Sequence, residues 1–295
     1  MRGTVNIAFD PAFDLKTPDK VVAPLLFNSP HSGRNYPESF IKASKLDADT
    51  LRRSEDCYVD ELFAGVVDIG LPLFQAHFPR AYLDVNREPF ELDPDMFDEP
   101  LPETVNTKSA RVAGGLGTIP RIVAEATEIY GKRLSYDEAE QRIRHIYMPY
   151  HGELYALLRG LRRGFGAALL IDCHSMPSTF RGQVEPRPDF VLGDRFGTSC
   201  SGAIIDAAQA SLQSLGYCVV RNRPYAGGFI TQSYGRPADG FHALQIEINR
   251  SLYMHEKTLE RRDRLTSLAN HLTSFAADLV AATGEVFLGM REAAE

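Results

Sequence analysis

Short apolar runs of strand length alternate along this chain with longer segments in which apolar residues recur at helical spacing. The strand-like runs occupy residues 21–27, 73–77, 81–85, 167–171, 190–192, 217–221 and 243–248. The helical segments cover roughly residues 47–68, 121–129, 135–162, 198–215 and 257–283. Because such alternation is typical of a mainly parallel sheet covered by helices, we predict an α/β fold. At 295 residues the chain is long enough for one large α/β domain or two small ones. The sequence has no internal repeat or low-complexity linker, and we expect a single domain over residues 1–295.

Cap and stop signals mark the ends of two predicted helices. Ser135 is followed three residues later by Glu138, which is the spacing of a capping box, so a helix should begin there. Pro149 should kink or interrupt this helix because proline has no N–H to donate. Gly216 is well suited to end the helix predicted over 198–215.

Two segments are rich in proline and glycine and lack clear periodicity. Residues 88–120 should form a long loop, and loops of that length in a compact domain are usually functional or mobile. Residues 222–240 lead directly into the strand that carries Glu247. We therefore expect this second segment to rim the same pocket as Glu247.

Composition and charge narrow the possible classes of function. The apolar content of 44% and the charged content of 24% are ordinary for a globular protein. A formal net charge of −7 argues against a nucleic-acid-binding protein, which normally carries a basic patch. It does not exclude a small anionic substrate, because a local field can oppose the net charge.

The sequence shows no signal for export or membrane insertion. Residues 1–7 lack the apolar core of a signal peptide, and no apolar run approaches the ~20 residues that span a bilayer. The four cysteines are scattered and form no CxxC pair, as expected of reduced thiols. We therefore expect a cytoplasmic protein that contacts neither membrane nor nucleic acid.

Two histidines stand where apolar strands give way to turns. His31 follows the run Pro-Leu-Leu-Phe-Asn-Ser-Pro, and His174 follows Ala-Ala-Leu-Leu-Ile-Asp-Cys. Ligands of α/β sheets bind outside the carboxyl ends of the strands, so both imidazoles are candidate metal ligands. A catalytic zinc ion usually takes three protein ligands, and the third should be a carboxylate. Glu55 and Asp56 are the candidates, although both also suit the first turn of a helix.

Glu247 is a carboxylate within an apolar strand. Ile246 and Ile248 should face one side of that strand, and Gln245 and Glu247 the other. A glutamate that faces an activated water can accept its proton and return it to a leaving amine. The alternative is a structural ion pair with Arg250 or another buried cation.

The remaining candidates are cations and histidines. Asn86 and Arg87 end an apparent strand, and an arginine beside an asparagine suits recognition of a carboxylate. Arg80 and Asp84 bracket the same strand and could pair with other charges. His151 and His242 fit a structural role as well as a contact with substrate.

Seven segments together resemble the N-formylglutamate amidohydrolase family. They appear in family order over residues 29–249: SPHSG (29–33), DCYVDEL (56–62), RAYLDVNR (80–87), PYH (149–151), DCHSM (172–176), GD (193–194) and HALQIEIN (242–249). The resemblance implies a hydrolase of N-acylated amino acids, with formate and glutamate as products in histidine degradation. It also implies a fold similar to zinc carboxypeptidases, with a mixed sheet of about eight strands between helices.

The resemblance implies roles for individual residues. His31 and His174 are similar to zinc ligands, Glu247 to the general base, and Asn86 with Arg87 to a clamp for the substrate carboxylate. One position departs from the carboxypeptidase pattern, in which an acidic ligand follows the first histidine by three residues. Arg34 stands there in this chain.

The carboxylate ligand must therefore come from elsewhere, and Asp56 fits the family pattern better than Glu55. Arg80 is our candidate for stabilising the oxyanion. His151 and His242 are assigned to substrate binding.

The sequence thus predicts metal-dependent hydrolysis of N-formyl-L-glutamate, with zinc as the default ion and other divalent metals open. Within the same class, the alternatives are deacylation of another N-acyl amino acid and trimming of a small peptide. From other classes, a non-catalytic binder of an acidic metabolite and a cysteine hydrolase centred on Cys173 remain open. The only partner expected is a small anionic substrate, and the oligomeric state is not predicted.

Overall fold

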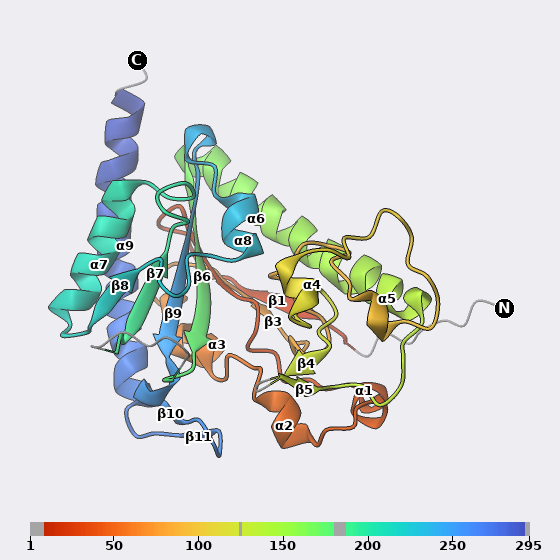
Figure 1. Ribbon diagram of the computed structural model, residues 1–295. Coiled ribbons are helices and arrows are strands. Elements are labelled where there is room, and N and C mark those ends of the chain that lie inside the picture. The colour runs from red at the N-terminus through yellow and green to blue at the C-terminus, as the bar shows by residue number, and fades with distance from the viewer. Residues whose placement is uncertain (1–8, 124–125, 180–186, 293–295) are drawn as a thin grey trace. The chain divides into compact units, whose positions relative to one another are not determined.

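A computed structural model describes residues 9–123, 126–179 and 187–292 of the chain (Figure 1). The contacts divide the chain into two compact units, each assembled from segments that are not consecutive. The first unit comprises Met1–Asp14, Pro30–Cys57 and Ala76–Leu154, and the second comprises Leu15–Ser29, Tyr58–Gln75 and Tyr155–Glu295. The single domain expected over 1–295 stays a prediction.

A seven-stranded sheet forms the centre of the fold, in the order β1-β3-β2-β6-β9-β7-β8. The strands are β1 (Phe13–Lys16), β2 (Leu25–Ser29), β3 (Leu73–Ala76), β6 (Ala168–Met176), β7 (Phe190–Gly193), β8 (Val219–Arg221) and β9 (Phe241–Asn249). The pairs β2–β3, β2–β6, β6–β9 and β7–β8 are parallel, whereas β7–β9 is antiparallel. The predicted α/β class with a mixed, mostly parallel sheet of about eight strands is confirmed, and the described residues form seven strands of that sheet.

Helices cover both faces of the strands β6 and β9 in the second unit (Figure 1). The helices of this unit are α3 (Val59–Leu62), α7 (Gly202–Ser214), α8 (Phe229–Tyr234) and α9 (Leu265–Glu292). Helix α9 packs against α7 and α3, while α8 contacts β6 and β9. Strand β9 is buried along its whole length, and its polar residues His242, Gln245, Glu247 and Asn249 are buried with the rest.

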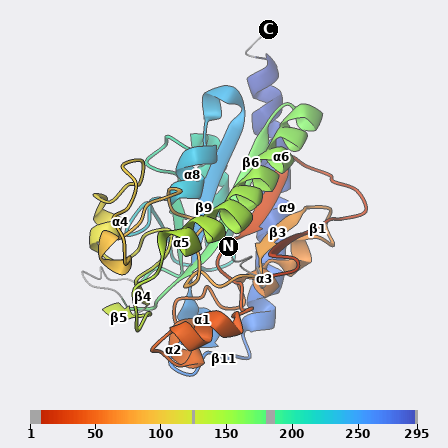
Figure 2. The ribbon, with the colours of Figure 1, turned by 90° about the vertical axis from the view of Figure 1, so that its right-hand side faces the viewer.

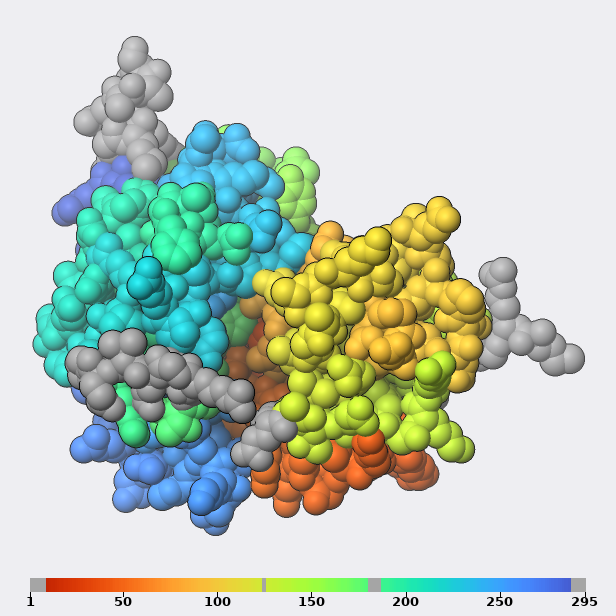
Figure 3. Space-filling view, in the orientation of Figure 1, coloured from red at the N-terminus to blue at the C-terminus, as the bar shows by residue number. Residues whose placement is uncertain are grey.

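The first unit is built from short helices and irregular segments. Its elements are α1 (Glu38–Ala43), α2 (Ala48–Arg52), α4 (Ala110–Ala113), the hairpin β4 (Ile122–Val123) and β5 (Thr127–Glu128), and α5 (Tyr136–Arg142). Helices α1 and α2 lie side by side in two views (Figure 1, Figure 2). The long loop predicted over 88–120 contains only α4 and the short helix Pro94–Met96, and it forms much of the visible surface of this unit (Figure 3).

A buried arginine organises the aromatic core of the first unit. The guanidinium of Arg142 lies 3.9 Å from the centre of the Tyr82 ring, and the rings of Phe40 and Tyr130 also face it. Its Nη1 donates to the carbonyl of Tyr82 and to the hydroxyl of Tyr130. The charge is thus accommodated by cation–π contacts and hydrogen bonds, and Arg142 fixes the segment that begins at Arg80.

The predicted helix 135–162 is present in three parts. Ser135 caps α5 by accepting a hydrogen bond from the Glu138 N–H, as its spacing predicted. A π-helical segment, Ile143–Tyr147, separates α5 from α6 (Met148–Phe165). Pro149 has no N–H for the carbonyl of residue 145, and a π-bulge is one way to absorb that loss.

Four sequence predictions of secondary structure were wrong or only partly right. The helix expected over 257–283 begins only at Leu265, as α9, and residues 260–261 form the short strand β11 (Glu260–Arg261). Residues 81–85 form turns and no strand, because Tyr82 and Leu83 donate back to the carbonyl of Pro79. Residues 121–129 form the β4–β5 hairpin rather than a helix, with residues 124–125 outside the described part. The helix expected over 47–68 is broken, and Tyr58 has a φ of 65°, in the left-handed region that interrupts a helix.

Two further findings concern helix hydropathy and the cysteines. Among the described residues, no helix has both the length and the apolar character that crossing a membrane requires. All four cysteines are free thiols, as the lack of a paired spacing predicted.

Candidate active site

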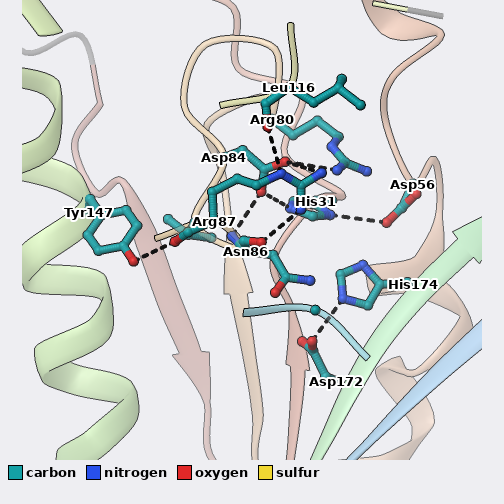
Figure 4. A network of polar contacts seen from close by, with 12 residues as sticks. His31, Asp56, Arg80, Asp84, Asn86, Arg87, Leu116, Tyr147, Asp172 and His174 are labelled. Carbon is teal, nitrogen blue, oxygen red and sulfur yellow. Dashed lines mark hydrogen bonds and ion pairs between the residues drawn. The ribbon is translucent and has the colours of Figure 1, made fainter. Parts of the chain in front are cut away.

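His31 lies in a buried turn of the first unit, between two carboxylates (Figure 4). Its Nε2 is 2.8 Å from Asp84 Oδ1, and its Nδ1 is 3.4 Å from Asp56 Oδ2. Gly33 permits this turn, since a Cβ there would stand 2.1 Å from the carbonyl oxygen of Phe78. A carboxylate at Nε2 favours the tautomer that carries the hydrogen on Nε2 and leaves a lone pair on Nδ1.

The structure separates the two candidate carboxylates Glu55 and Asp56. Glu55 is buried and accepts hydrogen bonds from the hydroxyl of Tyr36, the guanidinium of Arg52 and the thiol of Cys57. Asp56 faces His31, and its backbone N–H donates to the carbonyl of His31 at 3.0 Å. The break in the predicted helix 47–68 makes this approach possible. Burial and the neighbouring Glu55 raise the pKa of Tyr36, which keeps its hydroxyl a donor.

Asp84 is the centre of a network that sequence reasoning did not assign to the site. Besides His31, its carboxylate accepts a hydrogen bond from Arg80 Nη2 at 2.9 Å and faces Arg87 Nη2 at 3.6 Å. The backbone N–H of Asn86 donates to Asp84 Oδ1 at 2.8 Å. Burial raises the pKa of Asp84, but its contacts with Arg87, His31 and Arg80 outweigh burial and hold that pKa well below its usual value.

Arg87 is fixed by backbone carbonyls as well as by Asp84. Its Nε donates to the carbonyl of Leu116 and its Nη1 to the carbonyl of Asn86, at 2.9 and 2.8 Å. The hydroxyl of Tyr147 donates to the Arg87 carbonyl at 2.7 Å (Figure 4). The π-helical segment and the loop 88–120 therefore both help to position this arginine.

His151 lies in the same unit, on α6. Its Nε2 is 2.9 Å from the carbonyl oxygen of Val85, and its ring centre lies 4.3 Å from that of Tyr147. These contacts place His151 against the turn that carries Asn86 and Arg87. A direct role for His151 in substrate binding stays a prediction.

His174 lies on β6 in the second unit and is paired with a carboxylate on its own strand. Its Nε2 is 2.9 Å from Asp172 Oδ2, and Asn28 Nδ2 donates to Asp172 Oδ1 at 2.8 Å (Figure 4). Residues two apart on a strand share a face, which is why Asp172 can reach this imidazole. The relation could have been read from the sequence, whereas the pairing of Asp84 with His31 spans 53 residues and could not.

Cys173, between these two residues, does not behave as a nucleophile. It is fully buried, and its thiol donates to the carbonyl of Ile171. Burial and the adjacent Asp172 raise the pKa of the Cys173 thiol well above its ordinary value. A thiolate is the reactive form of cysteine, so this environment argues against the cysteine hydrolase.

Glu247 lies directly opposite His174 in the register of the parallel strands β6 and β9. Side chains opposite each other in adjacent strands share a face of the sheet. Gln245 Nε2 donates to Glu247 Oε1 at 2.9 Å, and the Gly228 N–H donates to Gln245 Oε1 at 2.8 Å. Gln245 thereby links the segment 222–240 to Glu247, in agreement with the predicted approach of that segment.

His242 is placed away from these groups. It lies on the alternate face of β9 from Glu247, with its ring centre 5.2 Å from that of Phe287 on α9. Its Nδ1 accepts a hydrogen bond from the backbone N–H of Ser201. Packing under α9 is thus the role that the structure gives His242, and it is left out of the proposed substrate site.

His242 should make the stability of the protein sensitive to acid. Burial lowers its pKa from 6.5 to about 4, so the unfolded chain takes up a proton at a higher pH than the folded chain. The stabilisation is complete above pH ~6.5 and is lost as the pH falls toward 4. Between pH 7.5 and pH 5, the free energy of unfolding should decrease by about 2 kcal/mol more in the native protein than in His242→Asn.

Chemical denaturation at the two pH values measures this difference. Asparagine retains an acceptor for the Ser201 N–H but does not titrate, so any constant cost of the substitution cancels between the two conditions. An equal pH dependence in both proteins would exclude His242 as the source.

The described residues include a group of buried donors, His31, Asp56 and His174, that could hold a metal ion. Two imidazoles and one carboxylate are a donor set used by catalytic zinc sites. The fold and these donors define the class: a mixed α/β protein with a candidate site for a divalent metal.

Comparison with known proteins specifies this class further. The family model of N-formylglutamate amidohydrolase matches residues 23–254. The N-formylglutamate deformylase of Pseudomonas putida is 32% identical over 240 residues, which cover 79% of this chain and 82% of that protein. The N-formylglutamate deformylase of Pseudomonas aeruginosa is 30% identical over 242 residues, with 79% and 83% covered. The chain therefore belongs to the N-formylglutamate amidohydrolase family.

Solved structures agree with this assignment. The crystal structure of N-formylglutamate amidohydrolase from Ralstonia eutropha JMP134 is 36% identical, covers 93% of this chain and 99% of its own, and has a TM-score of 0.88. A gene product of Agrobacterium tumefaciens shares the fold, with 17% identity and a TM-score of 0.66. The seven short motifs predicted this family, and the comparisons confirm it.

Proposed function

We propose that this protein hydrolyses the formyl amide of N-formyl-L-glutamate to formate and L-glutamate, with a divalent metal ion as cofactor. Membership of the family supports the reaction class and the substrate, since the two deformylases named above carry that substrate in their names. Zinc is the default ion. The proposal includes a role in histidine degradation and a cytoplasmic location, which the free cysteines support.

One observation carries the metal-dependent part of the proposal: each candidate imidazole ligand is paired with a buried carboxylate through Nε2. Asp84 pairs with His31, and Asp172 pairs with His174. Metal-binding histidines almost always donate their other ring N–H to such a partner, which fixes the tautomer. The donor set fits zinc, with His31 and His174 binding through Nδ1 and Asp56 as the third ligand.

When bound, zinc supplies a Lewis acid that lowers the pKa of water to about 7 and polarises the substrate carbonyl. Glu247 accepts a proton from the attacking water and later donates it to the departing amine. Gln245 Nε2 donates to one oxygen of the Glu247 carboxylate and so fixes the orientation of this carboxylate for the transfer. Water adds to the formyl carbon, the C–N bond breaks, and formate and the amine separate.

The arginines of the first unit recognise the anionic substrate. Arg87 and Asn86 hold a carboxylate of N-formyl-L-glutamate and so fix the scissile bond, while Arg80 stabilises the oxyanion. Arg80 and Arg87 bring two guanidinium groups to this part of the first unit. A local cluster of cations of this kind suits an anion despite the net charge of −7 for the whole chain.

Release of formate from N-formyl-L-glutamate by zinc-loaded protein tests the proposal. Release should occur, cease on addition of a chelator and return when zinc is restored. Protein that binds zinc and releases no formate would retain the metal site and eliminate this substrate. A panel of N-acyl amino acids and small peptides would then separate the remaining reactions of the same class. Release that resists the chelator would eliminate the metal-dependent mechanism.

A further inference from the structure

From the contacts of Asp84 we infer that this residue is a shared positioning residue, which orients the proposed metal ligand His31 and at the same time holds Arg80 and Arg87 for the substrate. The inference rests on the proposed function and goes beyond it by coupling metal affinity and substrate affinity through one side chain.

The two oxygens of the Asp84 carboxylate contact different groups. Oδ1 lies 2.8 Å from His31 Nε2 and accepts the Asn86 N–H at 2.8 Å. Oδ2 accepts from Arg80 Nη2 at 2.9 Å and lies 3.6 Å from Arg87 Nη2. One oxygen therefore fixes the imidazole and the turn at Asn86, and the other fixes the guanidinium groups (Figure 4).

Without the Asp84 charge, the two guanidinium groups would not stay together. The Arg80 side chain is 22% exposed and that of Arg87 14%, so both are largely desolvated, while Asp84 is 3% exposed. Two like charges in such surroundings repel each other and move toward water. Productive recognition of a carboxylate requires the donors to be held within about 0.5 Å, so loss of Asp84 should weaken substrate binding.

Asp172 offers a matched comparison within the same chain. It pairs with the Nε2 of His174 just as Asp84 pairs with that of His31, at 2.9 and 2.8 Å. Its other described side-chain partner is the neutral amide of Asn28. Asp172 should therefore affect metal affinity alone.

The test compares Asp84→Asn with Asp172→Asn by two measurements that are independent of turnover rate. Zinc affinity is measured by competition of the metal-free proteins with a chromophoric chelator. Affinity for the product L-glutamate is measured by calorimetry at saturating zinc, and KM is determined separately from kcat. Both variants should lose about 10–100-fold in zinc affinity. Only Asp84→Asn should also lose about 10-fold or more in affinity for L-glutamate, with a matching rise in KM.

Each outcome decides the inference. Native-like zinc and L-glutamate affinity in Asp84→Asn would overturn it, and so would a loss of zinc affinity alone, because Asp84 would then be equivalent to Asp172. If the native protein itself failed to bind zinc or to release formate, the proposed function would be wrong. Failure of the proposed function is therefore distinguishable from failure of the inference about Asp84.

Asp84→Glu serves if the asparagine variant does not fold. Glutamate keeps the charge for the arginines but displaces the carboxylate from His31 and the Asn86 N–H. It should lose zinc affinity by about 10-fold or more while L-glutamate affinity changes by less than about 3-fold. A loss of both affinities to the same extent, or of neither, would contradict the division of work between Oδ1 and Oδ2.

Discussion

Replacing Glu247 with glutamine should reduce the turnover of N-formyl-L-glutamate by about 10²–10⁴-fold, the range expected for loss of a general acid–base. Glutamine has nearly the shape of glutamate and keeps an oxygen acceptor for Gln245 Nε2, but it cannot take a proton from water. Zinc content and zinc affinity should stay within a few-fold of the native values, because Glu247 is not among the proposed ligands. Single-turnover release of formate, measured together with bound zinc, checks both statements.

The matched control for this substitution is Asp278→Asn, an isosteric carboxylate-to-amide change in the same unit. Asp278 lies on α9, where it accepts a hydrogen bond from the Ser211 hydroxyl. Asp278 contacts none of the proposed site residues in the described structure, so the Asp278→Asn variant should turn over N-formyl-L-glutamate at the native rate. Turnover near the native rate in Glu247→Gln would remove Glu247 from the role of base. Loss of zinc in that variant would instead show that Glu247 supports the metal site.

Replacing His174 with alanine should remove both metal and activity. The substitution deletes one of the proposed ligands and leaves the Asp172 carboxylate buried without its imidazole partner. Zinc affinity should therefore fall by more than the about 10–100-fold that is typical for loss of a residue that merely orients a ligand. Elemental analysis after dialysis and formate release measure the two losses.

The adjacent carboxylates Asp56 and Glu55 test which acidic residue is the third metal ligand. Asp56→Asn should lose zinc as His174→Ala does, whereas Glu55→Gln should retain it, because Glu55 is held by Tyr36, Arg52 and Cys57. Retention of zinc in His174→Ala would contradict the proposed centre. If Glu55→Gln lost zinc and Asp56→Asn retained it, Glu55 and not Asp56 would be the carboxylate ligand.

The sequence pattern predicted the structure well where burial and hydrogen bonds involve residues that are close together in the sequence. The strands β6 and β9 were both predicted, and the bounds of β9 were predicted within two residues. Strand β6 continues five residues beyond its predicted end at residue 171, so His174 lies within the strand and not at the turn that follows it. The cap at Ser135 depends on residues three apart, so it too could be read directly. The alternation of side chains along β9 predicts that Glu247 and Gln245 share one face, and their hydrogen bond agrees with that placement.

Pattern failed where apolar residues are buried without regular structure. Within residues 81–85, the apolar side chains of Ala81, Leu83 and Val85 are buried in the first unit, although the backbone there forms turns and not the predicted strand. Residues 121–129 contain Ile122 and Val123, whose branched side chains suit the short hairpin that replaces the predicted helix. In both cases the type of backbone structure was predicted wrongly.

The sequence by itself determined the α/β class, the family and most of the polar residues that the proposed site uses, because these depend on short-range spacing and on the types of side chain present. The tertiary structure alone decided which of these residues meet. The register of β6 and β9 sets Glu247 opposite His174, and the fold of the first unit brings Asp84 to His31 from 53 residues away. Contacts between residues far apart in the sequence depend on strand register and core packing, and neither can be predicted from a local sequence pattern.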